Sequence, residues 1–261
     1  MSGADIVVQV LADEGVDTIF GYSGGAILPT YDAVFRYNKL HAGADGRSPM
    51  PLIVPANEQG AGFMASGYAR ASGKVGVVMV TSGPGATNTV TPVRDCMADS
   101  VPVVVICGQV PTSAVGTDAF QEAPVSAIMG AVAKHVFLVT DPERLEATVR
   151  SAFELARTGR PGPVVLDIPK DVQNWQGAFM GSGTLPLPGY RRRLLAVTEN
   201  RLDDDACERF FTMLAESERP LIYAGGGVIN ANAAKSMRRL ASEYGIPVTT
   251  TLMALGASDT K

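Results

Sequence analysis

The chain has 261 residues, and its 22 Lys and Arg against 26 Asp and Glu give a formal net charge of −4. This balance excludes the basic surface that binds nucleic acid or an anionic membrane, and the 46% hydrophobic content is typical of a globular protein with a substantial core. The three cysteines are too few and too far apart to predict a disulfide framework or a zinc site, which favours a reducing compartment.

Helix and strand patterns alternate along the first part of the chain. Apolar residues at helical spacing predict helices, and short apolar or β-branched runs predict buried strands. The predicted helices cover residues 4–14, 26–37, 58–71 and 142–157, with one more after the turn at residues 83–85. The predicted strands cover residues 18–20, 52–54, 75–80, 101–107, 136–139 and 163–168.

This alternation predicts a doubly wound α/β domain over residues 1–171, with a sheet of about six parallel strands. Ligands of such sheets bind at the carboxyl ends of the strands. Glycine-rich loops follow Phe20, Val80 and Cys107 at that edge, and Glu58 begins the helix after another strand. We therefore expect the functional site at this edge of the sheet.

The remainder of the chain is predicted to form a linker and a second domain. Residues 172–200 are rich in Gly and Pro and have little periodicity, which is typical of a linker. In residues 201–261 we expect an incomplete Rossmann-like α/β domain, because two parallel strands cannot bury both faces of a sheet. Its predicted elements are helix 204–216, strand 221–224, the turn Gly225–Gly227, helix 231–244 and strand 247–251.

Glu58 opens a helical run that is rich in Gly and Ala. Acids are common in the first turn of a helix, where the dipole stabilises them by ~0.3–1 kcal/mol, so position alone favours a structural role. Interior glycines such as Gly60, Gly62 and Gly67 cost ~1 kcal/mol each relative to Ala, and this cost indicates that a backbone or a planar ring approaches closely. The residues alone leave both interpretations open.

Two other glycine-rich turns are weaker signals. The turn Gly83–Gly85 either joins a strand to a helix or forms a cradle of backbone amides, and it lacks the Gly-Lys-Ser/Thr of a P-loop. Gly225 and Gly227 resemble half of a dinucleotide-binding fingerprint. His41 and His135 have no partner at catalytic spacing, so we interpret both as structural or solvated.

Several blocks of sequence resemble the catalytic subunit of acetohydroxyacid synthase (acetolactate synthase), a thiamine-diphosphate-dependent enzyme family. The block 116–122, which contains Thr-Asp-Ala-Phe-Gln-Glu, is the most specific. The blocks around Glu58 and at 81–88 are shared with related decarboxylases and oxidases. The other matching blocks are 20–26, 108–111, 159–171 and 249–253, so the resemblance covers nearly the whole chain in the family's order.

The resemblance implies a role for Glu58, whose family counterpart hydrogen-bonds N1′ of the cofactor's aminopyrimidine and promotes loss of the C2 proton of the thiazolium ring. The family decarboxylates pyruvate and joins the product to a second 2-keto acid, a step in valine, leucine and isoleucine synthesis. The resemblance further implies that Gln121 and Gly25 act at the reacting centre, and that the cofactor is bound by Gly24, Pro84 and Asn88.

Two further groups of residues are implied by the resemblance. FAD, which is mostly structural in this family, is expected to contact Arg160, the turn formed by Gly225, Gly226 and Gly227, and the segment Thr251, Leu252 and Met253. A channel for substrates and inhibitors is expected to be lined by Pro111, Ala119, Phe120 and Lys170.

The chain departs from the family at three positions: Ser23 replaces Pro, Asn57 replaces His, and Phe63 replaces a His of some relatives. The family's Mg²⁺ and diphosphate ligands belong to a third domain outside these residues, so we expect no metal site in the chain. Family active sites form between the pyrimidine domain of one subunit and the diphosphate domain of another. We therefore expect a homodimer or a pairing with a full-length catalytic subunit, a possible regulatory subunit, and little activity from the chain alone.

Two alternatives stay open. One is another thiamine-diphosphate decarboxylase or oxidase, against which the block 116–122 argues. The other is a non-catalytic truncated paralogue that modulates a full-length subunit, which the changes at Ser23 and Asn57 favour. No targeting segment is recognised, and no run reaches the ~20 apolar residues that span a bilayer. We expect a cytoplasmic protein if the source is bacterial and a mitochondrial or plastid protein if it is eukaryotic, with 2-keto acids as ligands and neither nucleic acid nor membrane as partner.

Overall fold

The structure is a computed structural model that describes residues 1–199 and 202–258. The chain divides into two compact units, Met1–Leu194 and Leu195–Lys261. No helix in the described part of the chain is long and apolar enough to cross a membrane.

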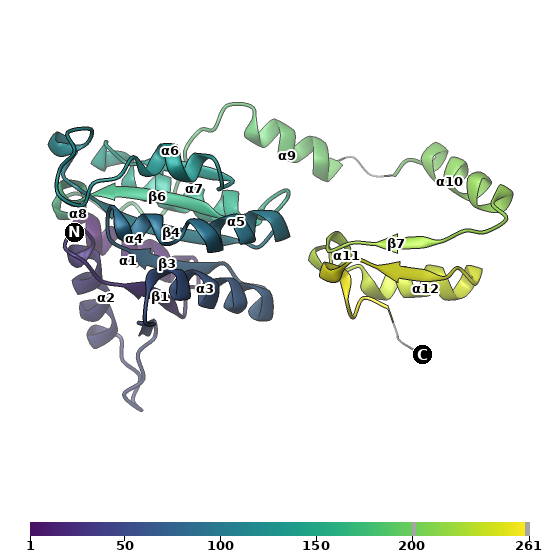
Figure 1. Cartoon of the computed structure of the whole chain (residues 1–261), viewed down its shortest axis with the longest axis horizontal. Coiled ribbons are helices and arrows are strands. Elements are labelled where there is room, and N and C mark those ends of the chain that lie inside the picture. Colours follow the sequence, from purple (N-terminus) through teal and green to yellow (C-terminus); the bar gives the residue numbers. More distant parts are fainter. Residues whose placement is uncertain (200–201, 259–261) are drawn as a thin grey trace. The chain divides into compact units, whose positions relative to one another are not determined.

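A six-stranded sheet in the order β2-β1-β3-β4-β6-β5 forms the centre of the first unit, and every pairing in it is parallel (Figure 1). This confirms the predicted fold class. Strands β3 and β4 are buried at every position, as expected for central strands that are covered on both faces. The strands are β1 (Ile19–Tyr22), β2 (Leu52–Ile53), β3 (Gly76–Val80), β4 (Val103–Gln109), β5 (His135–Leu138) and β6 (Val164–Pro169).

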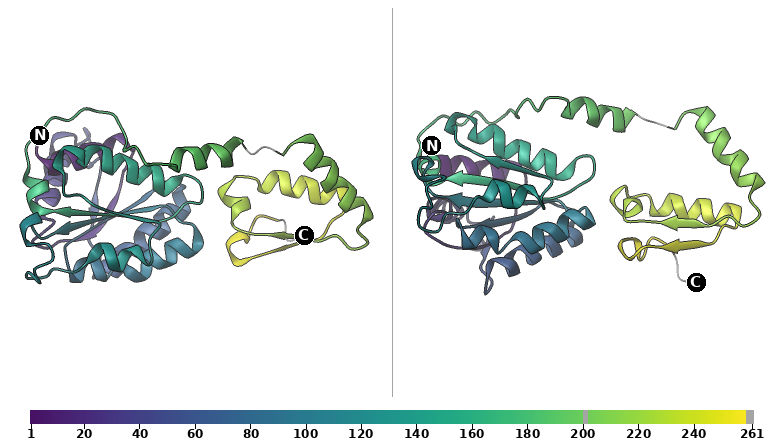
Figure 2. Two further views of the ribbon diagram at one scale, coloured as in Figure 1. Left: turned by 90° about the horizontal axis from the view of Figure 1, so that it is seen from above. Right: turned by 45° about the horizontal axis from the view of Figure 1, so that its top comes forward.

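Helices cover both faces of this sheet (Figure 2). The helices of this unit are α1 (Gly3–Asp13), α2 (Leu28–Leu40), α3 (Glu58–Ser72), α4 (Pro84–Thr87), α5 (Val90–Asp99), α6 (Val125–Gly130), α7 (Leu145–Arg157) and α8 (Lys170–Asn174), with the short 3-10 turns η1 (Thr112–Ala114) and η2 (Pro142–Arg144). The core on one face includes Leu11 of α1 and Phe153 of α7, and the core on the other face includes Ala65 of α3, Cys96 of α5 and Met129 of α6.

The small residues of α3 allow this helix to pack closely against its neighbours. A Cβ placed on Gly62 would lie 2.3 Å from Cγ of Pro92 in α5, and a Cβ on Gly76 of β3 would lie 2.4 Å from the carbonyl oxygen of Ala65. The glycines of this run predicted that another group packs closely against the helix. At these positions that group belongs to a neighbouring helix or strand of the same unit.

The segment after β6 is more ordered than its Gly and Pro content predicts. It includes α8 and a further helix, α9 (Tyr190–Glu199). Between them the backbone is held against α7, because the Met180 N–H donates to Glu146 at 2.8 Å and the Leu185 N–H donates to Ser151 Oγ at 2.7 Å. The compact unit runs on to Leu194, while the domain boundaries at residues 171 and 200 stay predictions; residue 200 lies outside the described residues.

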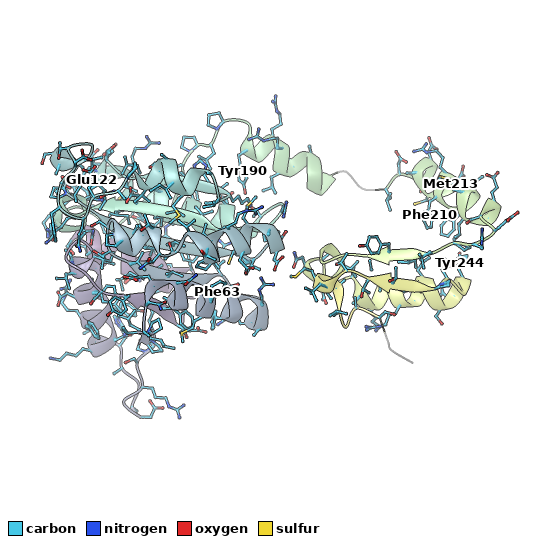
Figure 3. The ribbon with its side chains drawn as sticks, viewed as in Figure 1. Phe63, Glu122, Tyr190, Phe210, Met213 and Tyr244 are labelled. Atoms are coloured by element: carbon cyan, nitrogen blue, oxygen red, sulfur yellow. The ribbon has the colours of Figure 1, made fainter. Side chains whose placement is uncertain are left out.

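The second unit has a two-stranded parallel sheet of β7 and β8 with helices beside it. Its elements are α10 (Asp204–Glu216), β7 (Ile222–Ala224), α11 (Gly227–Asn230), α12 (Ala234–Tyr244), β8 (Val248–Thr250) and the 3-10 turn η3 (Leu252–Ala254). Large apolar side chains on α10 and at the end of α12 are exposed, among them Phe210, Met213 and Tyr244 (Figure 3).

Candidate active site

A crevice is expected between the carboxyl ends of β1 and β3, because the chain leaves these adjacent strands in opposite directions, toward β2 and toward β4. At this edge the Ala26 N–H donates to Thr81 Oγ1 at 3.2 Å. A Cβ on Gly24 would lie 2.5 Å from Cβ of Thr81, so only glycine permits this approach. Sequence reasoning did not single out Thr81, because the contact joins residues that are 55 positions apart.

Glu58 is the first residue of α3 and is half-buried at the same edge. The Asn88 side-chain amide donates to Glu58 Oε2 at 2.8 Å. A Cβ on Gly85 would lie 3.8 Å from Glu58 Oε1, so the glycine turn lies directly against the carboxylate. Asn57 caps the helix, since its Oδ1 accepts the Gly60 N–H at 2.7 Å, and Asn is among the residues that cap helices best. Asn57, which stands where the family usually has His, thus has a structural role as the cap of α3.

Tyr31 of α2 is a further neighbour of this carboxylate. Its hydroxyl is buried and donates to the carbonyl oxygen of Met79 at 3.0 Å. Burial and then the negative charge of Glu58 raise the pKa of Tyr31, so the phenol stays protonated at neutral pH. No sequence motif pointed to this residue, because its place in the site follows from the packing of α2 on β3.

The loop that carries Gln121 packs on the glycine turn. A Cβ on Gly83 would lie 2.3 Å from the Gln121 carbonyl oxygen, and the backbone of Gln121 is left-handed, with φ 57°. Glu122, labelled in Figure 3, braces the loop by accepting the Gly116 N–H and, at 3.0 Å, the Ala119 N–H. Hydrogen bonds from the loop backbone, that of Gly116 first, hold the pKa of Glu122 below its ordinary value. The braced loop places Gln121 beside the turn that touches Glu58.

Most of the predicted site residues follow a strand at the carboxyl edge of the sheet, and several of them are exposed. Phe120 is 87% exposed, and Gly25, Pro84 and Gln121 are exposed as well. These residues therefore form an exposed surface at the carboxyl edge of the sheet. The residues that the first unit places in the loops and helix starts at this edge are Gly24, Gly25, Glu58, Pro84, Asn88, Pro111, Ala119, Phe120, Gln121 and Lys170.

Arg160 lies at the other edge of the sheet, because it precedes β6. Its guanidinium donates to Ser100 Oγ at 2.8 Å and to the carbonyl oxygens of Met97 and Ala98, both at 2.9 Å. In this position Arg160 satisfies the hydrogen-bonding capacity of carbonyl groups at the C-terminus of α5. The structure does not bring it together with Glu58.

The other residues predicted for FAD meet within the second unit. The Thr251 N–H donates to the carbonyl oxygen of Ala224 at 2.9 Å, at the end of β7. A Cβ on Gly226 would lie 3.0 Å from Cβ of Met253, so the turn Gly225–Gly227 faces the segment Thr251–Met253. Leu252 in this segment is 80% exposed. No group of three or more His, Cys, Asp or Glu residues that could hold a metal ion gathers within residues 1–199 and 202–258.

Comparison with known proteins identifies two matching family profiles. The profile described as thiamine pyrophosphate enzyme, N-terminal TPP binding domain, matches residues 1–129. The profile described as thiamine pyrophosphate enzyme, central domain, matches residues 207–261. The two matches fall in the two compact units.

Curated relatives agree with these profiles. The chain is 45% identical over 256 residues to a Corynebacterium glutamicum protein named acetolactate synthase large subunit, covering 98% of this chain and 38% of the relative. It is 43% identical over 262 residues to the mitochondrial acetolactate synthase catalytic subunit of Saccharomyces cerevisiae, covering 99% of this chain and 36% of the relative. It is 41% identical over 261 residues to the chloroplastic acetolactate synthase of Arabidopsis thaliana, covering 98% and 36%. The chain thus spans less than half the length of these relatives.

Proposed function

Because this chain belongs to the thiamine pyrophosphate enzyme family, we propose that it supplies the pyrimidine-binding wall of an acetolactate synthase, which condenses pyruvate with a second 2-keto acid. The observation that carries the proposal is the Glu58 carboxylate, fixed by Asn88 and lying against Gly85 at the carboxyl edge of the sheet. The names of the relatives, which the chain matches over 98–99% of its own length, support the substrate class.

Two features of the residues beside Glu58 support the binding of a flat aminopyrimidine ring. A Cβ on Gly85 would lie 2.8 Å from Cγ2 of Thr81 and 3.8 Å from Glu58 Oε1, so a larger residue at position 85 would clash with Thr81 and crowd the carboxylate. The hydrogen bond from Asn88 uses Oε2, and Oε1 lies on the Gly85 side. Glu58 would therefore hold a ring nitrogen through Oε1.

Thiamine diphosphate, when bound, supplies the carbon nucleophile and the electron sink for decarboxylation. Glu58, at the start of α3, would hold the pyrimidine and exchange a proton with it at Oε1. Asn88 fixes the plane of the carboxylate. Gln121 orients the keto acid from the braced loop, and Gly25 leaves room for it, since a Cβ there would meet nothing within 4 Å.

The remaining predicted roles are part of the same proposal. We propose that the substrate channel is lined by Pro111, Ala119, Phe120 and Lys170, and the exposure of Phe120 supports a position at its mouth. We propose that FAD binds within the second unit, to the turn of Gly225, Gly226 and Gly227 and the facing Thr251, Leu252 and Met253. The contact of Arg160 with FAD stays a prediction.

The partners of the chain are also proposals. We propose that Mg²⁺ and the diphosphate are held by another subunit, and that the chain forms a homodimer or pairs with a full-length catalytic subunit, with a regulatory subunit as a further partner. We propose a cytoplasmic location in a bacterium and a mitochondrial or plastid location in a eukaryote.

The test is formation of acetolactate from pyruvate by the chain co-expressed with a full-length acetolactate synthase subunit in which the carboxylate that matches Glu58 is replaced by alanine. Thiamine diphosphate and Mg²⁺ are added. The expected result is activity in the co-expressed pair and none in either protein alone. A pair as inactive as its separate members would contradict the proposal and would favour a modulating role.

A further inference from the structure

Asp167 is a buried carboxyl group that the proposed chemistry does not use. It lies near the end of β6 and is 1% exposed. Its Oδ1 has no hydrogen-bond partner among residues 1–199 and 202–258. A buried ionisable group with an unused acceptor costs stability, so its presence calls for a physical reason.

Gln109, at the end of the neighbouring strand β4, engages the other oxygen of this carboxyl group. Gln109 Nε2 donates to Asp167 Oδ2 at 3.1 Å and to the carbonyl oxygen of Ala123 at 3.3 Å. Gln109 Oε1 accepts the Val110 N–H at 2.8 Å, which fixes which way the amide points. A side-chain amide has two N–H donors, and here one is available for each acceptor. Gln109 thus links the sheet to Ala123.

Ala123 ends the loop that carries Gln121. The start of the same loop is held by Asp171, whose carboxylate accepts the Thr112 N–H at 3.0 Å and the Thr112 hydroxyl. Glu122 braces the loop internally. The loop is therefore anchored at its start by Asp171 and at its end by Gln109, whose amide is held by Asp167.

We propose that Asp167 is a positioning residue: by holding the amide of Gln109 it fixes the end of the 111–124 loop, and with it Gln121, beside the turn at Gly83. The role of Gln121 in this statement rests on the proposed function. The anchoring of the loop does not, because it is a property of the chain without cofactor or substrate.

The ionisation of Asp167 is expected to make the opening of this loop depend on pH. Burial raises the pKa of Asp167 to about 7, against the hydrogen bond from Gln109, and the charge of Glu122 raises it further. Cys107 is the partner of Asp167 in register on β4, and burial raises the pKa of that thiol well above its ordinary value.

The other elements packed on β6 place few charges near Asp167. Leu138 of β5 is its uncharged partner in register, and α6 contains no titratable residue. Helix α7 belongs to the core on the opposite face, and Lys170 and Asp171 of α8 lie beyond the end of the strand. Opening of the loop admits water to Asp167 and lowers its pKa toward 3.8, so opening becomes easier as pH rises toward about 7.

The test is amide hydrogen exchange of the full chain, read for residues 112–123 and corrected for intrinsic rates. Gln109→Met removes both donors at similar volume and is expected to speed exchange of this loop about tenfold. Asn38→Leu is the matched control, because it removes two buried hydrogen bonds to Met50, far along the chain from the loop. This control is expected to leave exchange of the loop within about twofold.

Asp167→Asn separates a positioning role from a merely structural one. Its amide oxygen still accepts from Gln109, so the loop stays protected, but the dependence of loop protection on pH between about 5 and 8 is expected to disappear. Loop exchange unchanged in Gln109→Met, or the same pH dependence in Asp167→Asn as in the wild type, would overturn the proposal. If the co-expressed pair with the wild-type chain formed no acetolactate, that result would contradict only the proposed function. The exchange experiment measures the anchoring of the loop, which does not depend on that function.

Discussion

The Asn88 side chain donates a hydrogen bond to Glu58 Oε2 over 2.8 Å and so connects two helix ends that are 30 residues apart in the sequence. Replacement of Asn88 by Ala leaves the carboxylate free to rotate. Since a hydrogen bond to a charged group contributes ~1.5–3 kcal/mol and this one is exposed, we expect about a tenfold loss of acetolactate formation in the co-expressed pair. Thr87→Ala, which removes a neighbouring hydroxyl bonded to Pro84, serves as the control. Equal rates for both variants would show that Asn88 does not orient Glu58.

The neighbouring glycines Gly24 and Gly25 are predicted to differ in their tolerance of a methyl group. A Cβ on Gly24 would lie 2.5 Å from Thr81 Cβ, whereas a Cβ on Gly25 would meet nothing within 4 Å. Gly24→Ala is therefore expected to lower the free energy of unfolding by ~1–3 kcal/mol, as overpacking does, and Gly25→Ala by less than ~0.5 kcal/mol. Urea denaturation followed by the fluorescence of Trp175, the single tryptophan, measures both in the first unit. Two equally stable variants would refute the close contact at Thr81.

Arg150 of α7 forms ion pairs with Glu146 and with Asp13 of α1, and its side chain is only 10% exposed. Arg150→Met leaves the carboxylate of Glu146 buried without its cation, so we expect a loss of ~3–5 kcal/mol in the free energy of unfolding. Arg157→Met is the matched control, because the side chain of Arg157 pairs with Glu14 but is 48% exposed, and such a pair contributes ~0–1 kcal/mol. The same urea titrations measure both variants. A loss in Arg150→Met no larger than that in the control would mean that the buried pair adds little.

The pH dependence of stability is expected to carry a contribution from Asp167. Its pKa is raised by burial to about 7 in the folded chain, above the ordinary value of 3.8, so the folded state binds the proton more tightly. The stability that this group contributes is complete below pH ~3.8 and is lost as pH rises through ~7, by at most ~4 kcal/mol. Asp167→Asn lacks this loss, so the variant should gain stability relative to the wild type between pH 5 and 8. Burial lowers the pKa of His135, an effect of the opposite sign that cancels in the comparison. A difference in stability that is constant with pH would contradict this assignment.

The sequence predicted the elements whose signals are local. The β-branched run of β4 and the Glu58 helix with its acidic start were predicted because each depends on neighbouring residues. Helix α9 was not predicted, because the Gly and Pro residues before it favoured a linker over residues 172–200. The packing of the preceding segment on α7 depends on Glu146 and Ser151, which lie 34 residues away in the sequence. Such contacts leave no periodic signal.

The same limit applies to the candidate site. Motifs identified Glu58, Asn88 and Gln121, but not the hydrogen bond between the first two or the brace that Glu122 provides. Gln109 and Asp167 were also missed as a pair, since their hydrogen bond joins residues that are 58 positions apart on adjacent strands. The sequence can therefore supply the chemical groups, whereas their orientation depends on the strand order.

Glu58 is the carboxylate that we propose to exchange the proton of the cofactor's pyrimidine. The most direct measurement is the rate of acetolactate formation by the co-expressed pair with Glu58→Gln in place of the wild-type chain. Glutamine keeps the size of the side chain and the contact with Asn88 but cannot exchange the proton. We expect the rate to fall by ~10²–10⁴-fold with the pair still assembled, as for the loss of a general acid–base group. A Glu58→Gln pair that forms acetolactate at the wild-type rate would contradict the claim.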